Sequence, residues 1–141
     1  MKQFIVICSA IFVLSINVLA QGEIITKEQA NDLFGPVLVS VSMDATVLKN
    51  LLPQSPEVLM FQIVDNELFI LDGKRNVLLP FGGTMNNTEV FTLYSKTVLQ
   101  ELLTLSTLSS VYIERREAVL TITSGLFTLE FGLKCPPYCL D

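Results

Sequence analysis

The chain has 141 residues, of which 50% are hydrophobic and 16% are charged, and its formal net charge is −5. Its basic clusters are limited to Lys74-Arg75 and Arg115-Arg116. Neutralising phosphates needs a Lys/Arg surface, so we expect no nucleic-acid partner. The sequence contains no histidine, which removes the usual general base near neutral pH and the commonest metal ligand. We therefore expect no enzyme, no metal site and no cofactor.

Residues 1–20 have the pattern of a cleaved signal peptide. Lys2 supplies the positive start, Phe4–Leu14 is an apolar run, and Ala20 is a small residue at the cleavage site. A transmembrane anchor is the competing interpretation, but the apolar stretch is short for a span of about 20 residues. We expect export, either secretion or transfer to a periplasm. The mature chain, residues 21–141, then has the length of one domain and no transmembrane span.

The first predicted element of the mature chain is a helix over Thr26–Phe34. Thr26 and Gln29 have the spacing of a capping box. Gly35-Pro36 ends the helix, because Gly tolerates positive φ and Pro lacks an N–H. We expect this helix to pack as a lid against one end of a sheet.

The rest of the chain has the pattern of two copies of one unit, over about residues 37–81 and 88–133. Each copy has a strand, a helix and three further strands. The elements predicted in the first copy are the strand Val39–Met43, the helix Thr46–Leu52 and strands near 59–64, 68–71 and 77–81.

The alignment of the two copies rests on their helix starts. Asp44 and Ser95, 51 positions apart, are both good N-cap residues. A shift of 51 aligns the helices, and a shift of 50 aligns the following strands, so that Phe61 falls on Val111. The pattern predicts an internal duplication, with a polar linker at 82–88.

The strands of the two copies differ in polarity. In the second copy, hydrophobic and polar residues alternate over 127–133, which is typical of a sheet with one face in water. The first copy has strands that are apolar on both faces. The extra apolar side chains either lie under the helix 26–34 or form an exposed interface for a partner. The candidate interface residues are Val58, Met60, Phe61, Leu68, Phe69 and Leu71.

Cys135 and Cys139 flank the sequence Pro-Pro-Tyr. In an exported protein we expect them to form a disulfide that closes the C-terminal loop. The segment resembles the Cys-Pro-Tyr-Cys centre of glutaredoxins over five residues, but it has an extra proline and follows a strand instead of opening a helix. A redox role, metal binding and pairing with another chain are the remaining alternatives.

Two further motifs have surface interpretations. Glu114-Arg-Arg-Glu117 at a hairpin tip is typical of a solvated turn whose charges neutralise one another, since catalytic carboxylates need environments that separate their pKa values. Asn86-Asn87-Thr88 is an N-glycosylation pattern with Asn86 as the acceptor.

These elements predict an α+β fold: an N-terminal helix and two tandem strand–helix–three-strand units that form one curved, mainly antiparallel sheet with helices on one face. Their order resembles that of half a sliding-clamp protomer, a likeness of topology alone. The leading hypothesis is a non-enzymatic binding or assembly subunit that uses the apolar strands and the sheet edges. The second is a carrier of a small apolar ligand, and the third is a minor thiol–disulfide protein. The residues expected to hold the carrier's ligand are Phe61, Phe69, Phe81 and Phe91.

Overall fold

A computed structural model describes residues 22–85 and 89–135 of the chain. These residues form ten strands, three α-helices and one short 3-10 helix, which is a mixed fold of the predicted class. Within these ranges, no helix is long and apolar enough to cross a membrane. The segment 1–20, Asn86 and Cys139 lie outside the described residues, so the signal peptide, the glycosylation and the disulfide stay predictions.

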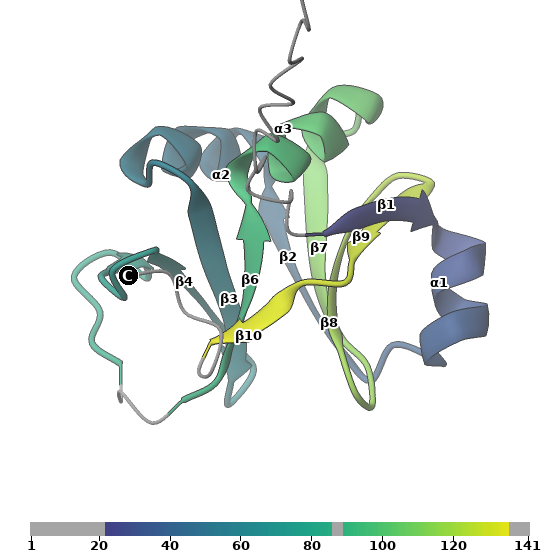
Figure 1. Cartoon of the computed structure of the whole chain (residues 1–141), viewed down its shortest axis with the longest axis horizontal. Coiled ribbons are helices and arrows are strands. Elements are labelled where there is room, and N and C mark those ends of the chain that lie inside the picture. The colour runs from purple at the N-terminus through teal and green to yellow at the C-terminus, as the bar shows by residue number, and fades with distance from the viewer. Residues whose placement is uncertain (1–21, 86–88, 136–141) are drawn as a thin grey trace, which may run out of the picture.

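The strands form two five-stranded antiparallel sheets, which we name sheet A and sheet B (Figure 1). The strands of sheet A are β1 (Glu23–Thr26), β2 (Val39–Asp44), β7 (Ser110–Arg115), β8 (Leu120–Ser124) and β9 (Phe127–Glu130). The strands of sheet B are β3 (Val58–Val64), β4 (Glu67–Asp72), β5 (Val77–Leu79), β6 (Phe91–Ser95) and β10 (Leu133–Cys135). Their spatial orders are β1-β9-β8-β7-β2 and β10-β6-β3-β4-β5. The prediction of one curved sheet is therefore wrong.

The helices are α1 (Lys27–Phe34), α2 (Ala45–Leu51) and α3 (Lys96–Leu105), and the 3-10 helix η1 (Leu52–Gln54) extends α2. At α2 the side chain of Asp44 accepts a hydrogen bond from the Thr46 amide at 2.7 Å. At α3 the Ser95 hydroxyl accepts from the Val98 amide at 3.4 Å. These side chains satisfy N–H groups that the first turn of a helix leaves without intrahelical partners.

The two sheets exchange strands. β2 precedes α2 but pairs with β7, the strand that follows α3. Conversely, β6 precedes α3 but pairs with β3, the strand that follows α2 and η1. Each sheet therefore contains strands from both predicted units. Because of this exchange, the two units do not lie end to end in one sheet.

The strand register differs from the predicted shift. The two matching helix caps each lie opposite a strand residue: Ser95 lies opposite Val58 of β3, and Asp44 lies opposite Ser110 of β7. Val58 and Ser110 are therefore equivalent, and they are 110 − 58 = 52 positions apart. The predicted shift of 50 is wrong by two residues. An even error keeps every side chain on its face, so Val- and Leu-rich strands match almost equally well at either shift. The duplication itself stays a prediction.

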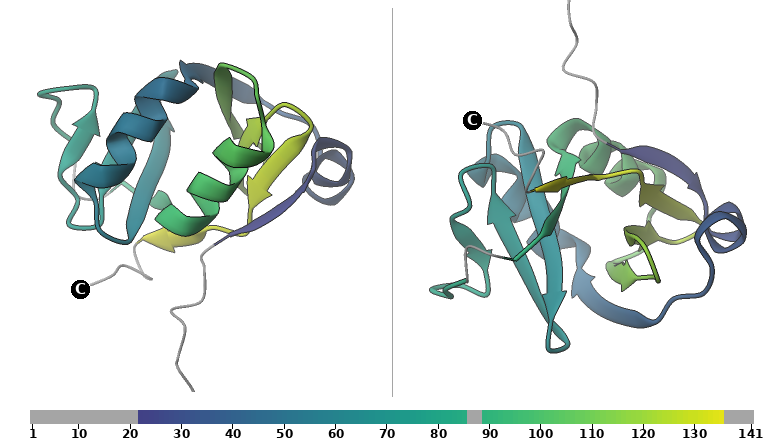
Figure 2. Two further views of the ribbon diagram at one scale, coloured as in Figure 1. Left: turned by 90° about the horizontal axis from the view of Figure 1, so that it is seen from above. Right: turned by 60° about the horizontal axis from the view of Figure 1, so that its bottom comes forward.

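The main core lies between the inner faces of the two sheets and beneath α2 and α3, which lie side by side (Figure 2). Leu48 and Leu99, one from each helix, are fully buried in it. Tyr94 of β6 crosses from sheet B to sheet A, and its hydroxyl donates a hydrogen bond of 2.6 Å to the Leu120 carbonyl. This bond ties the two sheets together inside the core.

Helix α1 lies apart from α2 and α3, beside β1 and β9 (Figures 1 and 2). Its buried residue, Ala30, does not belong to the main core. Since the inner face of sheet A packs on that core, α1 covers the outer face. Helix α1, the predicted lid, therefore does not share the covered face of α2 and α3.

Candidate functional site

The residues predicted as an exposed interface lie inside the folded chain. Phe61 and Leu68 are buried in the main core. Val58, Met60 and Leu71 are buried in a second apolar cluster on the outer face of sheet B, and Phe69 is half-buried against it. These six side chains therefore do not present a docking face, and our interface hypothesis for them is withdrawn.

The cover of this second cluster is not helix 26–34, as one alternative had it. The cluster is completed by Phe91, Leu93 and Cys135, all buried, with Met85 and Leu133 packed against it. The guanidinium of Arg75 lies 5.2 Å from the centre of the Phe91 ring and donates to the Glu89 carbonyl at 3.2 Å. Among the described residues, Arg75, Met85 and Leu133 thus pack against the apolar outer face of sheet B.

The four phenylalanines proposed to hold an apolar ligand are separated. Phe61 belongs to the main core and Phe91 to the second cluster, whereas the Phe81 side chain is 99% exposed on the loop after β5. A groove of about 500 Å³ lies on the surface between η1 and α3, but Leu52, Leu103 and polar side chains line it instead. A carrier site built from those four residues is ruled out by this geometry.

The turn predicted to be solvated contains a buried ion pair. Arg116 is 1% exposed, and its guanidinium lies 3.3 Å from the carboxylate of Glu114, which is also buried. Arg116 donates further hydrogen bonds to Thr121 at 3.2 Å, to the Asn31 side chain at 2.8 Å and to the Gly35 carbonyl. Our prediction of a solvated turn is therefore wrong for Glu114 and Arg116, and Arg116 fastens α1 to sheet A.

The outer face of sheet A is also covered, although its sequence pattern predicts contact with water. The buried polar residues there are Glu114, Thr121, Thr123, Thr128 and Glu130. Thr123 donates to Glu114 at 3.0 Å, and its hydroxyl lies 2.8 Å from that of Thr128. We name this set, with Arg116, the polar face. Its alternation of polar with apolar residues is visible in the sequence, but nothing there shows that a helix returns to cover it.

The described residues offer few groups for catalysis or metal binding. They contain no cluster of three or more His, Cys, Asp or Glu side chains that could hold a metal ion. Cys135 is buried beneath Arg75, whose guanidinium lies 3.5 Å from its sulfur. The carboxyl of Glu130 is buried. Its pKa is raised to about 7, mainly because burial disfavours the charged form and to a lesser extent because the charge of Glu23 lies nearby.

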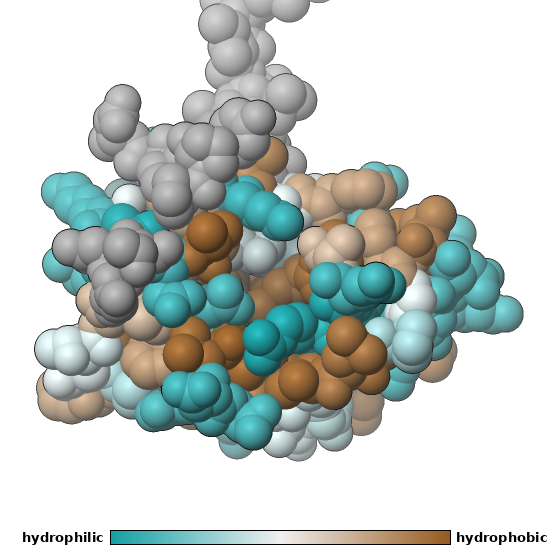
Figure 3. Space-filling model, turned by 90° about the horizontal axis from the view of Figure 1, so that it is seen from below, coloured by the Kyte–Doolittle hydropathy of each residue, from teal (hydrophilic) through white to brown (hydrophobic). Residues whose placement is uncertain are grey.

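Hydrophobic residues on the underside of the molecule, opposite α2 and α3, are intermixed with hydrophilic ones (Figure 3). Single exposed apolar side chains such as Leu126, which is 77% exposed, are ordinary for a soluble surface. At the sheet edges, by contrast, backbone N–H and C=O groups lack a second strand and can pair with another chain.

The two sheets have four edge strands, and three of them are short. β5 has three residues and β1 has four, and β10 has three within the described part of the chain, which ends at Cys135. The pairing of β4 with β5 also shifts register between Ile70 and Leu71, and β10 carries the exposed Lys134. Short strands, irregular pairing and edge lysines are features that discourage pairing with another chain.

The fourth edge strand, β2, has none of these features. It has six residues, pairs with β7 in regular register and contains no Pro, Gly or Lys. Within the described part of the chain, β7 is its only strand partner. Ser40 and Ser42 are exposed, while Val39, Val41 and Met43 are half-buried at the margin of the main core. The edge of β2 is therefore our candidate functional site.

Comparisons with known proteins do not assign the chain to a family: no family model, curated protein or solved structure matches it.

Proposed function

We propose that the chain is an exported, non-enzymatic assembly subunit that associates through the free edge of β2. The observation that carries this proposal is the contrast between β2 and the three short or protected edges. An unprotected edge of six residues can extend its sheet by accepting a strand from another chain. Export is supported by the pattern of residues 1–20, and the non-enzymatic role by the lack of histidine.

A second copy of the chain fits this edge. If two β2 strands pair antiparallel with Val41 opposite its own copy, Ser40 faces Ser42, and Val39 faces Met43. Both residues of every pair then lie on the same face of the extended sheet. In the same register Asp44 faces Leu38, so no two acids lie directly opposite each other.

The test uses the two exposed serines. In the proposed register, the double variant Ser40→Lys/Ser42→Lys places lysine opposite lysine twice. The double variant Ser40→Lys/Ser42→Glu instead places lysine opposite glutamate twice. Cross-strand charge pairs are worth roughly 0.2–1 kcal/mol each, so the two variants should differ several-fold or more in dimer affinity. Because both serines are exposed, neither variant should change the fold.

The measurement is the native mass of the mature protein by sedimentation over a range of concentrations. We expect a dimer for the natural chain, dissociation for the Lys/Lys variant and retention for the Lys/Glu variant. A mixture of the Lys/Lys variant with Ser40→Glu/Ser42→Glu should recover a mixed dimer. A natural chain that stays monomeric at high concentration, or a Lys/Lys variant that keeps its mass, contradicts the proposal.

A further inference from the structure

Helix α1 is held to sheet A by few apolar contacts. Ala30 is its one buried residue, and Phe34 adds an edge-to-face contact with Phe131, with ring centres 5.6 Å apart. Leu33 is 61% exposed. By contrast, α3 buries four hydrophobic residues. The apolar area that keeps α1 in place is therefore small.

The polar face beneath α1 is already hydrogen-bonded within sheet A. Thr128, Thr123 and Glu114 form a chain of hydrogen bonds, and Glu114 pairs with Arg116. Exposing a face of this kind to water loses little hydrophobic stabilisation, and its polar groups gain water as partners. Opening would break the bonds from Arg116 to Asn31 and Gly35, the bond from the Lys27 amide to the Leu126 carbonyl and the pairing of β1 with β9. It would also take the half-buried Ile24 of β1 off the margin of the main core.

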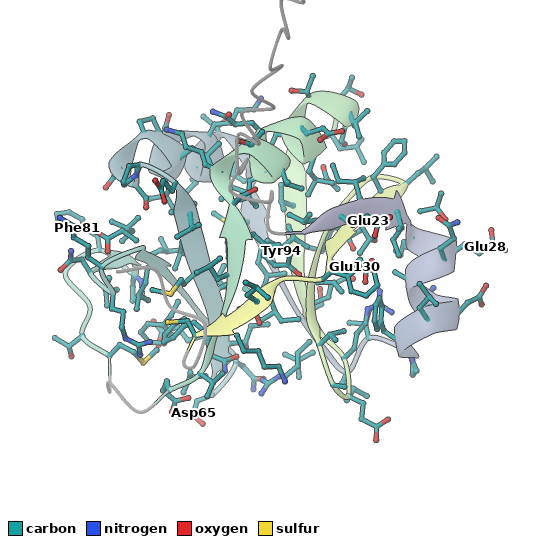
Figure 4. The ribbon with its side chains drawn as sticks, viewed as in Figure 1. Glu23, Glu28, Asp65, Phe81, Tyr94 and Glu130 are labelled. Carbon is teal, nitrogen blue, oxygen red and sulfur yellow. The ribbon has the colours of Figure 1, made fainter. Side chains whose placement is uncertain are left out.

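Glu130 is the exception within this satisfied network. Its side chain follows Thr128 by two positions on β9 and therefore lies on the same face. It is fully buried, and neither carboxyl oxygen has a hydrogen-bond partner among the described residues. Figure 4 shows Glu130 near Glu23 and Tyr94, whereas Glu28 lies on the far side of α1.

Within residues 22–85 and 89–135, the ionisable groups around Glu130 give it no compensating cation. Glu23 of β1 lies directly opposite it in register. Tyr94 of β6 lies close enough for the charge of Glu130 to raise its pKa, after burial, well above the ordinary value. Arg116 directs its guanidinium to Glu114, Thr121 and α1. The remaining charged side chains on α1 and β10 are exposed: Lys27, Glu28, Asp32 and Lys134.

We propose that β1 and α1 form a pH-sensitive lid over the polar face, closed while the Glu130 carboxyl is protonated and opened when it ionises. An ionised Glu130 would be a buried charge without a partner, directly opposite a second carboxylate on β1. Opening the lid hydrates the carboxylate of Glu130 and separates it from Glu23, whose side chain is already exposed. It also uncovers the edge of β9, the neighbour of β1 in sheet A.

The sign of the pH dependence follows from the raised pKa. In the closed lid the pKa of Glu130 is about 7, against 4.5 for an ordinary glutamate, so the closed state holds the proton more tightly. The stabilisation of the closed lid is fully present below pH 4.5 and is lost as the pH rises to about 7. Within this window the equilibrium constant for opening should rise roughly tenfold per pH unit.

The experiment is amide hydrogen exchange of the mature protein from below pH 4.5 to above pH 7, corrected for the intrinsic chemical rate. For the natural chain we expect the opening constants of the α1 and β1 amides to rise across this window and then level off. The Glu130→Gln variant keeps the size of the side chain without its charge, so its lid should stay closed at every pH. Glu117→Gln, which changes an exposed acid, is the matched control and should keep the natural profile.

Three results would overturn the proposal: a flat profile in the natural chain, an unchanged profile in Glu130→Gln, or the same profile in the α3 amides, which would indicate global unfolding. If Glu130→Gln does not fold, a carbon-13 titration of the carboxyl in the natural chain decides instead. A midpoint near pH 7 that coincides with the rise in α1 exchange supports the lid, and a midpoint near 4.5 refutes it.

Discussion

The outer faces of the two sheets are both covered, but by different means. Sheet B has an apolar outer face that includes Met60, Leu71 and Phe91, and the side chains of Arg75, Met85 and Leu133 pack against it. Sheet A has the polar face, and its cover is α1, which follows the edge strand β1 of the same sheet and is bound by Arg116. An apolar face must stay covered for the fold to be stable, whereas a hydrogen-bonded polar face can be uncovered with a smaller loss of hydrophobic stabilisation. The comparison indicates one permanent cover and one removable cover.

The largest effect should come from Arg116→Met, which removes the link between α1 and the polar face. It leaves the Glu114 carboxylate buried without its cation, a loss of about 3–5 kcal/mol in the free energy of unfolding. Urea denaturation measures it, with Arg115→Met as the control, for which we expect less than about 1 kcal/mol. Adding Glu114→Gln to Arg116→Met should recover part of the loss. If Arg115→Met and Arg116→Met lower the free energy of unfolding equally, the buried Glu114–Arg116 pair does not stabilise the fold as proposed.

The permanent cover of sheet B is tested by Leu71→Ala. Leu71 is 1% exposed in the second cluster, so truncation leaves a cavity and should cost about 2–5 kcal/mol. Leu126→Ala, at a side chain that is 77% exposed, is the matched control and should change the unfolding free energy little. A small loss for Leu71→Ala would mean that the outer face of sheet B is open in solution.

The link between the sheets is tested by Tyr94→Phe. The variant leaves the Leu120 carbonyl without its 2.6 Å donor inside the core, which should cost about 1–3 kcal/mol. Tyr112→Phe, at an exposed ring, controls for the loss of a hydroxyl. If both variants unfold at the same temperature, the Tyr94 hydroxyl does not stabilise the contact between the two sheets.

The smallest effects, about 1 kcal/mol each, should come from the helix caps, and they sharpen the comparison. Asp44 caps α2, which is part of the main core, so Asp44→Ala should lower the global free energy of unfolding. Thr26 caps α1 by accepting from the Gln29 amide at 3.1 Å. Thr26→Ala should speed amide exchange in α1 and leave global unfolding nearly unchanged. A global effect of Thr26→Ala would show that α1 unfolds with the core.

The sequence was sufficient for local features of the fold. Asp44 and Ser95 are caps because a short side-chain oxygen can reach the first N–H groups of a helix, a property of a few adjacent residues. The positions of most strands follow from hydrophobic runs bounded by turn residues. Such signals need no knowledge of what packs against them.

The sheet assignments could not be read in the same way. The pairing of β2 with β7, and of β6 with β3, depends on contacts between distant segments that no local pattern encodes. The polar face illustrates the same limit. Thr123, Thr128 and Glu130 alternate with apolar residues as in a sheet with one face in water, yet all three are buried, on the face to which α1 returns beside β9. The free edge of β2 is a consequence of the strand order and is equally hidden in the sequence.

The most direct test of a removable cover beside a permanent one is native-state amide exchange of the natural chain across a series of low denaturant concentrations. We expect the α1 amides to exchange through a local opening that depends little on denaturant, at a much lower free energy than amides of α3 and β3. The β4 amides, beneath the cover of sheet B, should exchange only with global unfolding. Exchange of α1, α3 and β4 at one common free energy and denaturant dependence would contradict the account.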